Sequence, residues 1–224
     1  MKSLTHYIQE KLVIKKNKYN YFPQTKEELQ DIIKQRIKQE GNEVNLNDID
    51  VSNITDMSSL FKDTDFNGDI SKWDVSNVKD IRGMFCACLK FNKDISKWDV
   101  SNVKDMSKMF LGCKKFNADI SKWDVSNVTN MSFTFYGCES FNQDISKWEV
   151  SNVTNMSNMF FECETFNQDI SSWDVSKVTN MLYMFGFCKS FNQNISKWDV
   201  SSVNNINYIF DYCTIEEKYK PKFK

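Results

Sequence analysis

The apolar and polar positions of this chain repeat with a period of 25 residues. All six tryptophans share one register, at Trp73, Trp98, Trp123, Trp148, Trp173 and Trp198. Six of the seven cysteines share a second register, which runs from Cys88 to Cys213. A fixed period of this length is typical of proteins in which each unit buries its apolar face only by stacking on its neighbours. The pattern therefore predicts a repeat solenoid over residues 44–215.

Each unit combines two hydrophobic periodicities. In residues 141–165, Trp148 and Val150 alternate with charged residues, which is the two-residue period of a strand. Further along the unit, apolar residues recur at spacings of three, four and three, which is the period of one or two helical turns. These residues are Val153, Met156, Phe160 and Cys163. We therefore predict an α/β fold that resembles leucine-rich repeats, with one short parallel strand and one short helix or turn per unit.

The two ends of the array differ from its middle. Thr25 and Glu28 form a capping box before a stripe of apolar residues, and Gly41 follows it, so a helix is expected over about 25–40. The unit at 44–65 is degenerate, as terminal repeats usually are. The predicted organisation is an N-terminal extension and capping helix at 1–43, a seven-rung solenoid at 44–215 and a charged C-terminal tail at 216–224.

The repeated run is specific enough to indicate a family. Asp-Ile-Ser-Lys-Trp-Asp-Val-Ser-Asn-Val is followed by Met-Phe and Cys and is closed by Phe-Asn, over residues 44–213. This pattern resembles the BspA-like family of leucine-rich-repeat surface proteins, whose 25-residue version occurs in mycoplasma-type surface lipoproteins. The resemblance implies a right-handed solenoid and a role in adhesion or recognition at a cell surface, with a host protein or the chain itself as partner.

Charge and hydropathy exclude some classes of function. The formal net charge is −1, from 29 basic and 30 acidic side chains, which provides no field for binding nucleic acid. There is no run of 18 apolar residues, so no membrane insertion is expected. The start of the chain has no signal-peptide pattern, which predicts a cytoplasmic protein. The resemblance implies the alternative of a cell-surface or secreted protein.

The polar rows of the repeat could carry chemistry. Two aspartate rows, which begin at Asp69 and Asp74, could bind calcium or serve as acid and base. The plainer interpretation is that the first row bonds turn backbone and that lysines neutralise the second. An asparagine row that begins at Asn67 is expected to form a buried amide ladder. The single histidine, His6, lies outside the repeats, so we predict no catalytic residue, no metal and no cofactor.

The cysteine row has three interpretations. Metal binding requires paired spacing, which one cysteine per 25 residues does not supply. Disulfides between rungs require α-carbons about 4.4–6.8 Å apart, a separation that rungs at strand spacing would allow. The third interpretation is a row of small buried side chains, which we favour because free cysteine is among the most buried residue types.

The most informative positions are those at which the units differ. Opposite the apolar stripe of the predicted helix, aromatic residues accumulate from the third unit onward. They are Phe133, Tyr136, Phe161, Tyr183, Phe187, Tyr208 and Tyr212. Exposed aromatic patches tend to mark contacts, so these residues are candidates for binding a partner protein or a second copy. The alternative is that some of them cover the C-terminal end of the array.

The sequence therefore predicts a non-enzymatic repeat scaffold for protein–protein recognition or adhesion. One alternative is a self-assembling structural array. Another is an elongated enzyme that uses carboxylates from neighbouring rungs on a polysaccharide. Such an enzyme would need one or two units that break the pattern to build a site, whereas the polar rows stay nearly unchanged from unit to unit.

Overall fold

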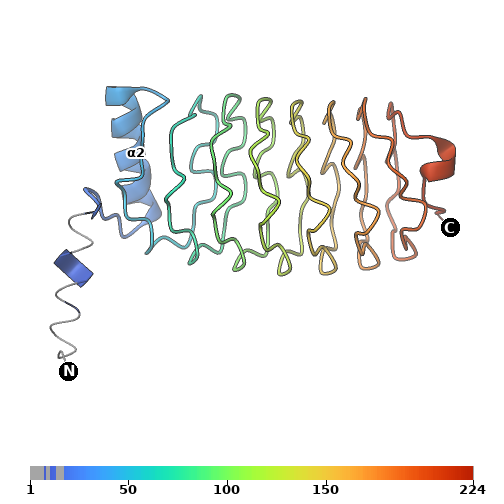
Figure 1. Cartoon of the computed structure of the whole chain (residues 1–224), viewed down its shortest axis with the longest axis horizontal. Helices are drawn as coiled ribbons and strands as arrows, with labels where there is room; N and C mark the ends of the chain where they lie inside the picture. The colour runs from blue at the N-terminus through green and yellow to red at the C-terminus, as the bar shows by residue number, and fades with distance from the viewer. Residues whose placement is uncertain (1–7, 9–10, 14–17, 224) are drawn as a thin grey trace.

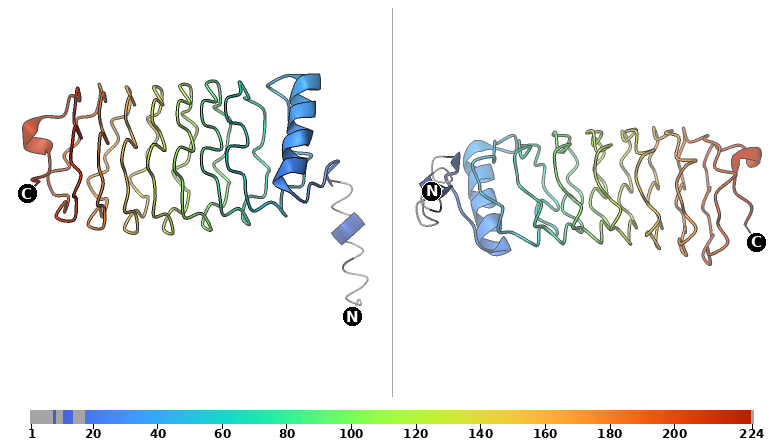
Figure 2. Two further views of the ribbon diagram at one scale, coloured as in Figure 1. Left: turned by 180° about the vertical axis from the view of Figure 1, so that it is seen from behind. Right: turned by 60° about the horizontal axis from the view of Figure 1, so that its bottom comes forward.

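The computed structural model describes residues 8, 11–13 and 18–223, and it forms a row of stacked coils (Figure 1). Each 25-residue unit contributes one coil, and the row is close to straight from either side (Figure 2). Helix α2, Lys26–Glu40, stands against the first coil at the N-terminal end of the row. Within the predicted N-terminal extension, residues 1–7, 9–10 and 14–17 lie outside the described residues.

Stacked aromatic side chains fill the centre of the row. Phe85 and Phe110 occupy the same position in neighbouring coils, with ring centroids 5.6 Å apart and planes 2° apart. Trp98 and Trp123 stack in the same way at 6.5 Å. The buried indole of Trp123 donates its Nε1–H to the carbonyl of Ile95 in the preceding unit, at 3.0 Å. Identical residues thus pack on one another from coil to coil, which explains why the apolar positions repeat so strictly.

The predicted strand is wrong. The described residues contain no β-strand, and neighbouring coils share only isolated parallel bridges, such as Asn130 with Asn155. In the segment expected to be a strand, the N–H of Trp148 donates to the carbonyl of Ile145, three residues back. Val153 bonds Val150 in the same way. The alternation of Trp and Val therefore comes from two consecutive turns, which use the backbone donors that a sheet would have required.

Of the short helix or turn predicted in each unit, the helix is also wrong, and the segment is made of turns. Among the described residues, the structure assigns bounds to α2 and to a short 3-10 helix, η1 (Glu217–Tyr219), and both lie outside the repeated pattern. Within a coil, every second amide of the segment that follows the valine turns donates to the next coil. The N–H of Asn158 bonds the carbonyl of Leu182 at 2.8 Å, and that of Phe160 bonds Met184 at 2.9 Å. The predicted α/β solenoid of leucine-rich-repeat type is therefore replaced by a stack of turns.

We call these eight-residue stretches ladder segments, because their amides connect each coil to the next. They are residues 56–63, 80–87, 105–112, 130–137, 155–162, 180–187 and 205–212. Two residues in each ladder segment, four positions apart, have a left-handed backbone with φ between 52° and 75°. Glycine occupies three of these positions, at Gly83, Gly112 and Gly137, and residues with side chains occupy the others. Left-handed residues reverse the local twist of the chain, so an α-helix cannot propagate through the segment.

The cysteine row consists of free thiols. Five members, from Cys88 to Cys188, are buried, whereas Cys86 and Cys213 are partly buried. The thiol of Cys138 donates to the carbonyl of Phe110 in the preceding unit, at 3.0 Å between sulfur and oxygen. Burial raises the pKa of the Cys88 thiol to about 11 and shifts its buried counterparts in the same direction. The row therefore serves packing and keeps its protons at neutral pH, as expected for small buried side chains.

Different structures close the two ends of the stack. Leu29 and Ile33 of α2 are buried against the first coil, and Thr25 caps the helix by accepting the N–H of Glu28. At the other end, the chain after Cys213 turns back over the last coil, where Ile215 and Pro221 are buried. The N–H of Ile195 donates to the carbonyl of Tyr219 in this tail. Each end of the aromatic core is thereby covered by a segment outside the repeat.

The left-handed positions make a testable prediction about stability. Glu162 is exposed and has φ 57°, a conformation that costs a residue with a side chain about 1–2 kcal/mol. Because glycine gains freedom in the unfolded chain, replacing Glu162 with glycine is expected to raise the free energy of unfolding by a net ~0.5–1 kcal/mol. The matched control is Glu149→Gly, at an exposed site with negative φ, where stability should fall. Urea denaturation compares the two variants, and destabilisation by both would contradict the strain at Glu162.

Candidate functional site

Seven aromatic residues of the last four ladder segments lie together on one face of the stack, and we call them the aromatic strip. They are Phe133, Tyr136, Phe161, Tyr183, Phe187, Tyr208 and Tyr212. Five of them occupy left-handed backbone positions, where φ lies between 52° and 60°. The exceptions, Tyr136 and Phe161, directly precede the second left-handed residue of their segments. The turns of the ladder segments therefore aim all seven side chains away from the buried Phe and Met rows.

Ring contacts connect the strip without a break. Tyr136 stacks on Phe161 of the next coil at 4.7 Å between centroids. Phe161 meets Tyr183 and Phe187 edge to face, at 5.6 and 5.3 Å. Tyr183 and Phe187 then stack on the aromatic residues of the last coil, Tyr208 and Tyr212, at 4.8 and 4.7 Å. Stacked and edge-to-face pairs at such distances each contribute about 0.5–1.5 kcal/mol beyond burial.

Gly186 provides the space in which the strip changes its packing. A Cβ at this position would lie 2.8 Å from the ring of Phe161 and 3.3 Å from that of Tyr183. Other units carry a side chain at the equivalent position, such as Tyr136 and Phe161 itself. The missing side chain lets the Phe161 ring lean over the next coil and contact two aromatic residues there. Gly186 is therefore part of the strip's architecture, although it contributes no ring.

The strip becomes more exposed toward the C-terminal end. Its first five members are half-buried, whereas Tyr208 is 59% and Tyr212 73% exposed. Partial burial raises the pKa of Tyr136, and the negative charge of Glu162 adds to that effect, so the phenol stays neutral at physiological pH. Lys108 extends the strip by one coil, since its Nζ lies 5.9 Å from the centre of the Phe133 ring.

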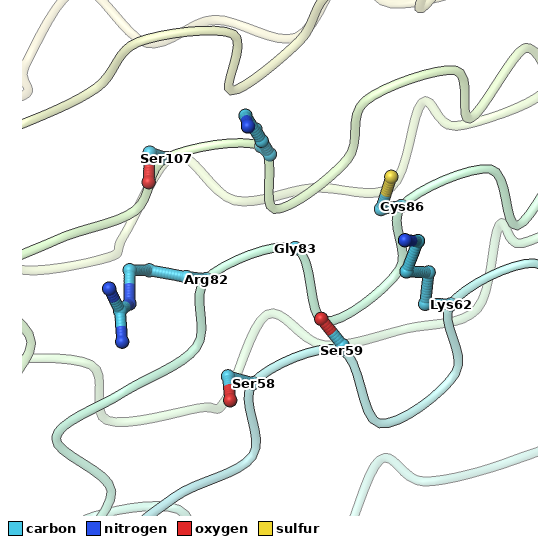
Figure 3. Close-up of a pocket in the computed structure, with 8 residues that line it drawn as sticks. Ser58, Ser59, Lys62, Arg82, Gly83, Cys86 and Ser107 are labelled. Carbon is cyan, nitrogen blue, oxygen red and sulfur yellow. The ribbon is translucent and has the colours of Figure 1, made fainter.

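Beyond Lys108, the ladder segments of the first coils form a shallow polar hollow (Figure 3). Two of its left-handed positions carry small residues, Ser59 and Gly83, and a third carries Lys108. The hollow's cations are Lys62, Arg82 and Lys108, and Arg82 is paired with Asp80 at 2.6 Å. Within the part of the chain that the structure describes, no group of three or more His, Cys, Asp or Glu could hold a metal ion. The hollow therefore offers hydroxyls and cations rather than a metal or acid–base centre.

The aspartate rows hold turns, as the plainer interpretation predicted for the first row. Asp144 accepts the backbone N–H of Ser146 at 2.9 Å, and the same bond occurs in four other units. The second row makes equivalent bonds, such as that from Ser126 to Asp124 at 3.0 Å. The second row therefore also holds turns, a role that the prediction of neutralisation by lysine did not include.

The asparagine row forms a ladder, but it is not buried as predicted. The N–H of Asn142 donates to Oδ1 of Asn117 at 2.9 Å, and Asn92, Asn117, Asn167 and Asn192 repeat this bond to the preceding unit. The N–H of Asn67 instead donates to the backbone carbonyl of Asn42. All members are partly or fully exposed. Their position at a corner of each coil explains the difference, because a corner needs a side-chain acceptor for its backbone and does not need to exclude water.

The seven aromatic residues that the sequence singled out lie on one surface, but the local structure predicted for them was wrong. Their expected position was the outward face of a helix, whereas they lie at turn positions of the ladder segments. The sequence-based interpretation gave no role to Gly186, nor to the left-handed backbone. The glycines at 83, 112 and 137 were the available signal, because three units place glycine where a left-handed residue is needed.

A chain of stacked 25-residue coils with periodic aromatic ladders is a repeat protein. The family described as “Mycoplasma protein of unknown function, DUF285” matches residues 28–132 and again residues 118–220. The chain belongs to this family, whose two overlapping matches together span 28–220. No curated protein and no solved structure matches the chain. In the described residues, no helix is long and apolar enough to span a bilayer.

The contact between Gly186 and Phe161 can be tested by a double-mutant cycle. Gly186→Ala places a methyl group against the Phe161 ring and should lower stability by about 0.5–1.5 kcal/mol as the aromatic contacts are lost. In a Phe161→Ala background the two closest contacts of the methyl group are gone and only the Tyr183 ring remains, at 3.3 Å. There Gly186→Ala should cost less than in the parent chain, or stabilise by up to ~1 kcal/mol. Urea denaturation of the four proteins measures the coupling. Equal effects in both backgrounds would refute the packing role.

The turn-forming aspartates predict a specific acid sensitivity. The hydroxyl and backbone N–H of Ser146 lower the pKa of Asp144, and the equivalent serines lower those of Asp94, Asp119 and Asp169. Because these pKa values are lower in the folded state, their contribution to stability is present above the unfolded pKa of about 4. It is lost as the pH falls through the folded values.

Replacing these four aspartates with asparagine should therefore preserve stability at pH 7 and weaken the loss of stability on acidification to about pH 3. The chain already uses asparagine this way, since Asn194 accepts the N–H of Ser196. The control replaces four aspartates that accept no backbone N–H from the described residues, at 31, 63, 65 and 211. Thermal unfolding followed from pH 7 to 3 distinguishes the variants; equal acid sensitivity in both would contradict the turn mechanism.

Proposed function

We propose that the chain is a non-enzymatic repeat scaffold that binds a partner protein through the aromatic strip. The observation that carries this proposal is the placement of bulky aromatic residues on left-handed backbone at the surface. Phe133, Tyr183, Phe187, Tyr208 and Tyr212 all have φ between 52° and 60°. Strained backbone of this kind tends to cluster at functional sites.

The stability of the chain alone does not account for these residues. A left-handed conformation costs a residue with a side chain about 1–2 kcal/mol, and a ring contact returns about 0.5–1.5 kcal/mol. The two effects nearly cancel, whereas glycine avoids the cost, as at Gly83, Gly112 and Gly137. Aromatic residues at these positions therefore gain the chain little stability. What they add is a continuous apolar surface that reaches solvent at Tyr208 and Tyr212.

The chemistry of the strip favours a protein partner. It presents ring faces and edges without a convergent polar pocket, which suits apolar or Arg side chains at the centre of a protein interface. Ion pairs join neighbouring coils just beyond the ladder segments. Lys114 pairs with Glu139 of the next coil at 2.8 Å, and each lies two residues after the last left-handed residue of its segment. Charged pairs beside an apolar centre resemble the polar rim of such interfaces. Recognition or adhesion is the role that this arrangement supports best.

The electrostatics disfavour the enzymatic alternative. A glycoside-cleaving pair requires one carboxyl group that remains protonated near neutral pH. The serine that follows two residues later lowers the pKa of each first-row aspartate, from Asp69 to Asp169, and keeps it ionised. Each of these carboxylates already accepts a backbone N–H of its own turn. The rows therefore act as structural acceptors in the proposed scaffold.

Site-specific photo-crosslinking tests the proposal. A benzophenone amino acid placed at Tyr136 or Phe161 is expected to form adducts with a partner protein when purified chain is mixed with cell-surface extract. The same group at Lys147, an exposed position outside the strip, is the matched control and should form none. The proposal would be refuted if all three sites crosslinked the same proteins, or if neither site in the strip formed an adduct. Sedimentation analysis of the chain alone identifies adducts between copies.

A further inference from the structure

The last coil presents a row of backbone donors that no described residue accepts. In the earlier coils the ladder amides, apart from that of Ile81, bond the next coil, as from Tyr183 to Asn207 at 3.1 Å and from Phe185 to Ile209 at 2.9 Å. The corresponding amides of the last ladder segment have no hydrogen-bond partner within residues 18–223. We call this row the C-terminal edge. It consists of the N–H groups of Ile206, Tyr208, Phe210 and Tyr212.

Side-chain exposure shows that this edge lacks a neighbour. Met181, whose N–H is the first in its ladder segment to bond the next coil, is 1% exposed, whereas its counterpart Ile206 is 39% exposed. The tail closes a different part of the same end, because Ile209 and Ile215 remain 4% and 5% exposed. Figure 1 shows the tail and η1 folded over the last coil at the C-terminal end of the row. The core is thus covered, while the edge amides have no partner among the described residues. Lys220 of the tail lies 5.4 Å from the centre of the Phe210 ring.

We propose that the C-terminal edge binds a peptide segment of another protein, which adds one further rung to the stack. The segment must present backbone carbonyls at alternate residues, because that is what each coil offers to its predecessor. It must also carry an aromatic or apolar side chain to lie on Tyr208 or Tyr212. This mode corresponds to the addition of a strand to an exposed sheet edge, in which the backbone gives affinity and the side chains give specificity.

The polarity of the hydrogen bonds selects this occupant over a second copy. Two C-terminal edges cannot pair, since each offers only donors in this row. The carbonyls that match them, at positions 56, 58, 60 and 62, belong to the first coil. Helix α2 stands against that coil, and Lys26 bonds Asp56 and Ser58 there. A helix is about 10 Å wide, so an intact copy cannot approach to the ~5 Å at which hydrogen-bonded backbones lie.

The test uses amide hydrogen exchange in the full chain with a peptide of residues 203–213, in which serine replaces the cysteine. This segment is the rung that the preceding coil binds, through the carbonyls of Asn205, Asn207, Ile209 and Asp211. The amides of Tyr183, Phe185 and Phe187 are the internal reference, since they are already bonded. Without peptide, the four edge amides are expected to exchange at least about tenfold faster than the reference.

Saturating peptide is expected to slow the edge amides about tenfold, and a scrambled peptide is expected to leave them unchanged. Ester bonds in place of the amides after Asn207 and Ile209 weaken the carbonyl acceptors and should reduce this protection. Edge amides that stay fast with saturating peptide would overturn the proposal. Protection that appears without peptide and increases with protein concentration would also overturn it, in favour of a second copy.

The proposal for the C-terminal edge and the proposal for the aromatic strip can be tested independently. A Tyr136→Ala and Phe161→Ala double variant removes the centre of the strip and leaves the last ladder segment intact. Peptide protection of the edge should persist in this variant, while partner crosslinking from a benzophenone amino acid at Phe133, another member of the strip, should be lost. Loss of edge protection in the double variant would show that the two surfaces are one site and would overturn an independent edge.

Discussion

The hydrogen bond from every second ladder amide to the next coil is the interaction on which the rest of the structure depends. It fixes the register between coils, because the N–H of Phe135 meets the carbonyl of Met159 and each equivalent amide repeats the step. The register then places phenylalanine on phenylalanine and tryptophan on tryptophan in the core. It also requires left-handed residues, since the alternate amides must point along the stack while those between them close turns within a coil.

The sequence was sufficient to predict the array and its buried positions. The register of Trp148 and Cys163 follows directly from stacking, because a residue that packs on its own copies must recur. The local backbone could not be read in the same way. The spacing of Val153, Met156, Phe160 and Cys163 fits a helix, yet Asn158 and Glu162 between them are left-handed. Hydrophobic periodicity reports which side chains are buried and does not distinguish a helix from a chain of turns that buries the same residues.

The candidate surface was partly predictable for a related reason. Phe161 and Phe187 were predicted as candidates because the units differ at these positions. In a repeat protein, stacking largely explains the residues that stay the same from unit to unit. Their mutual contact depends on Gly186, whose effect is visible only in three dimensions. The aspartate rows illustrate the opposite case. Their regular spacing suggested chemistry. The bond from Ser146 to Asp144 shows that an aspartate repeated in every unit can serve to form a turn.

The direction of the ladder bonds has an electrical consequence for the molecule. Four columns of peptide groups run through the stack with their carbonyls facing the N-terminal coil and their N–H groups facing the C-terminal coil. One column, through Thr129, Thr154 and Thr179, runs the other way. Peptide dipoles of about 3.5 D add when aligned, as they do in an α-helix. The stack therefore has a positive pole at its last coil, which is opposite in chain direction to a helix.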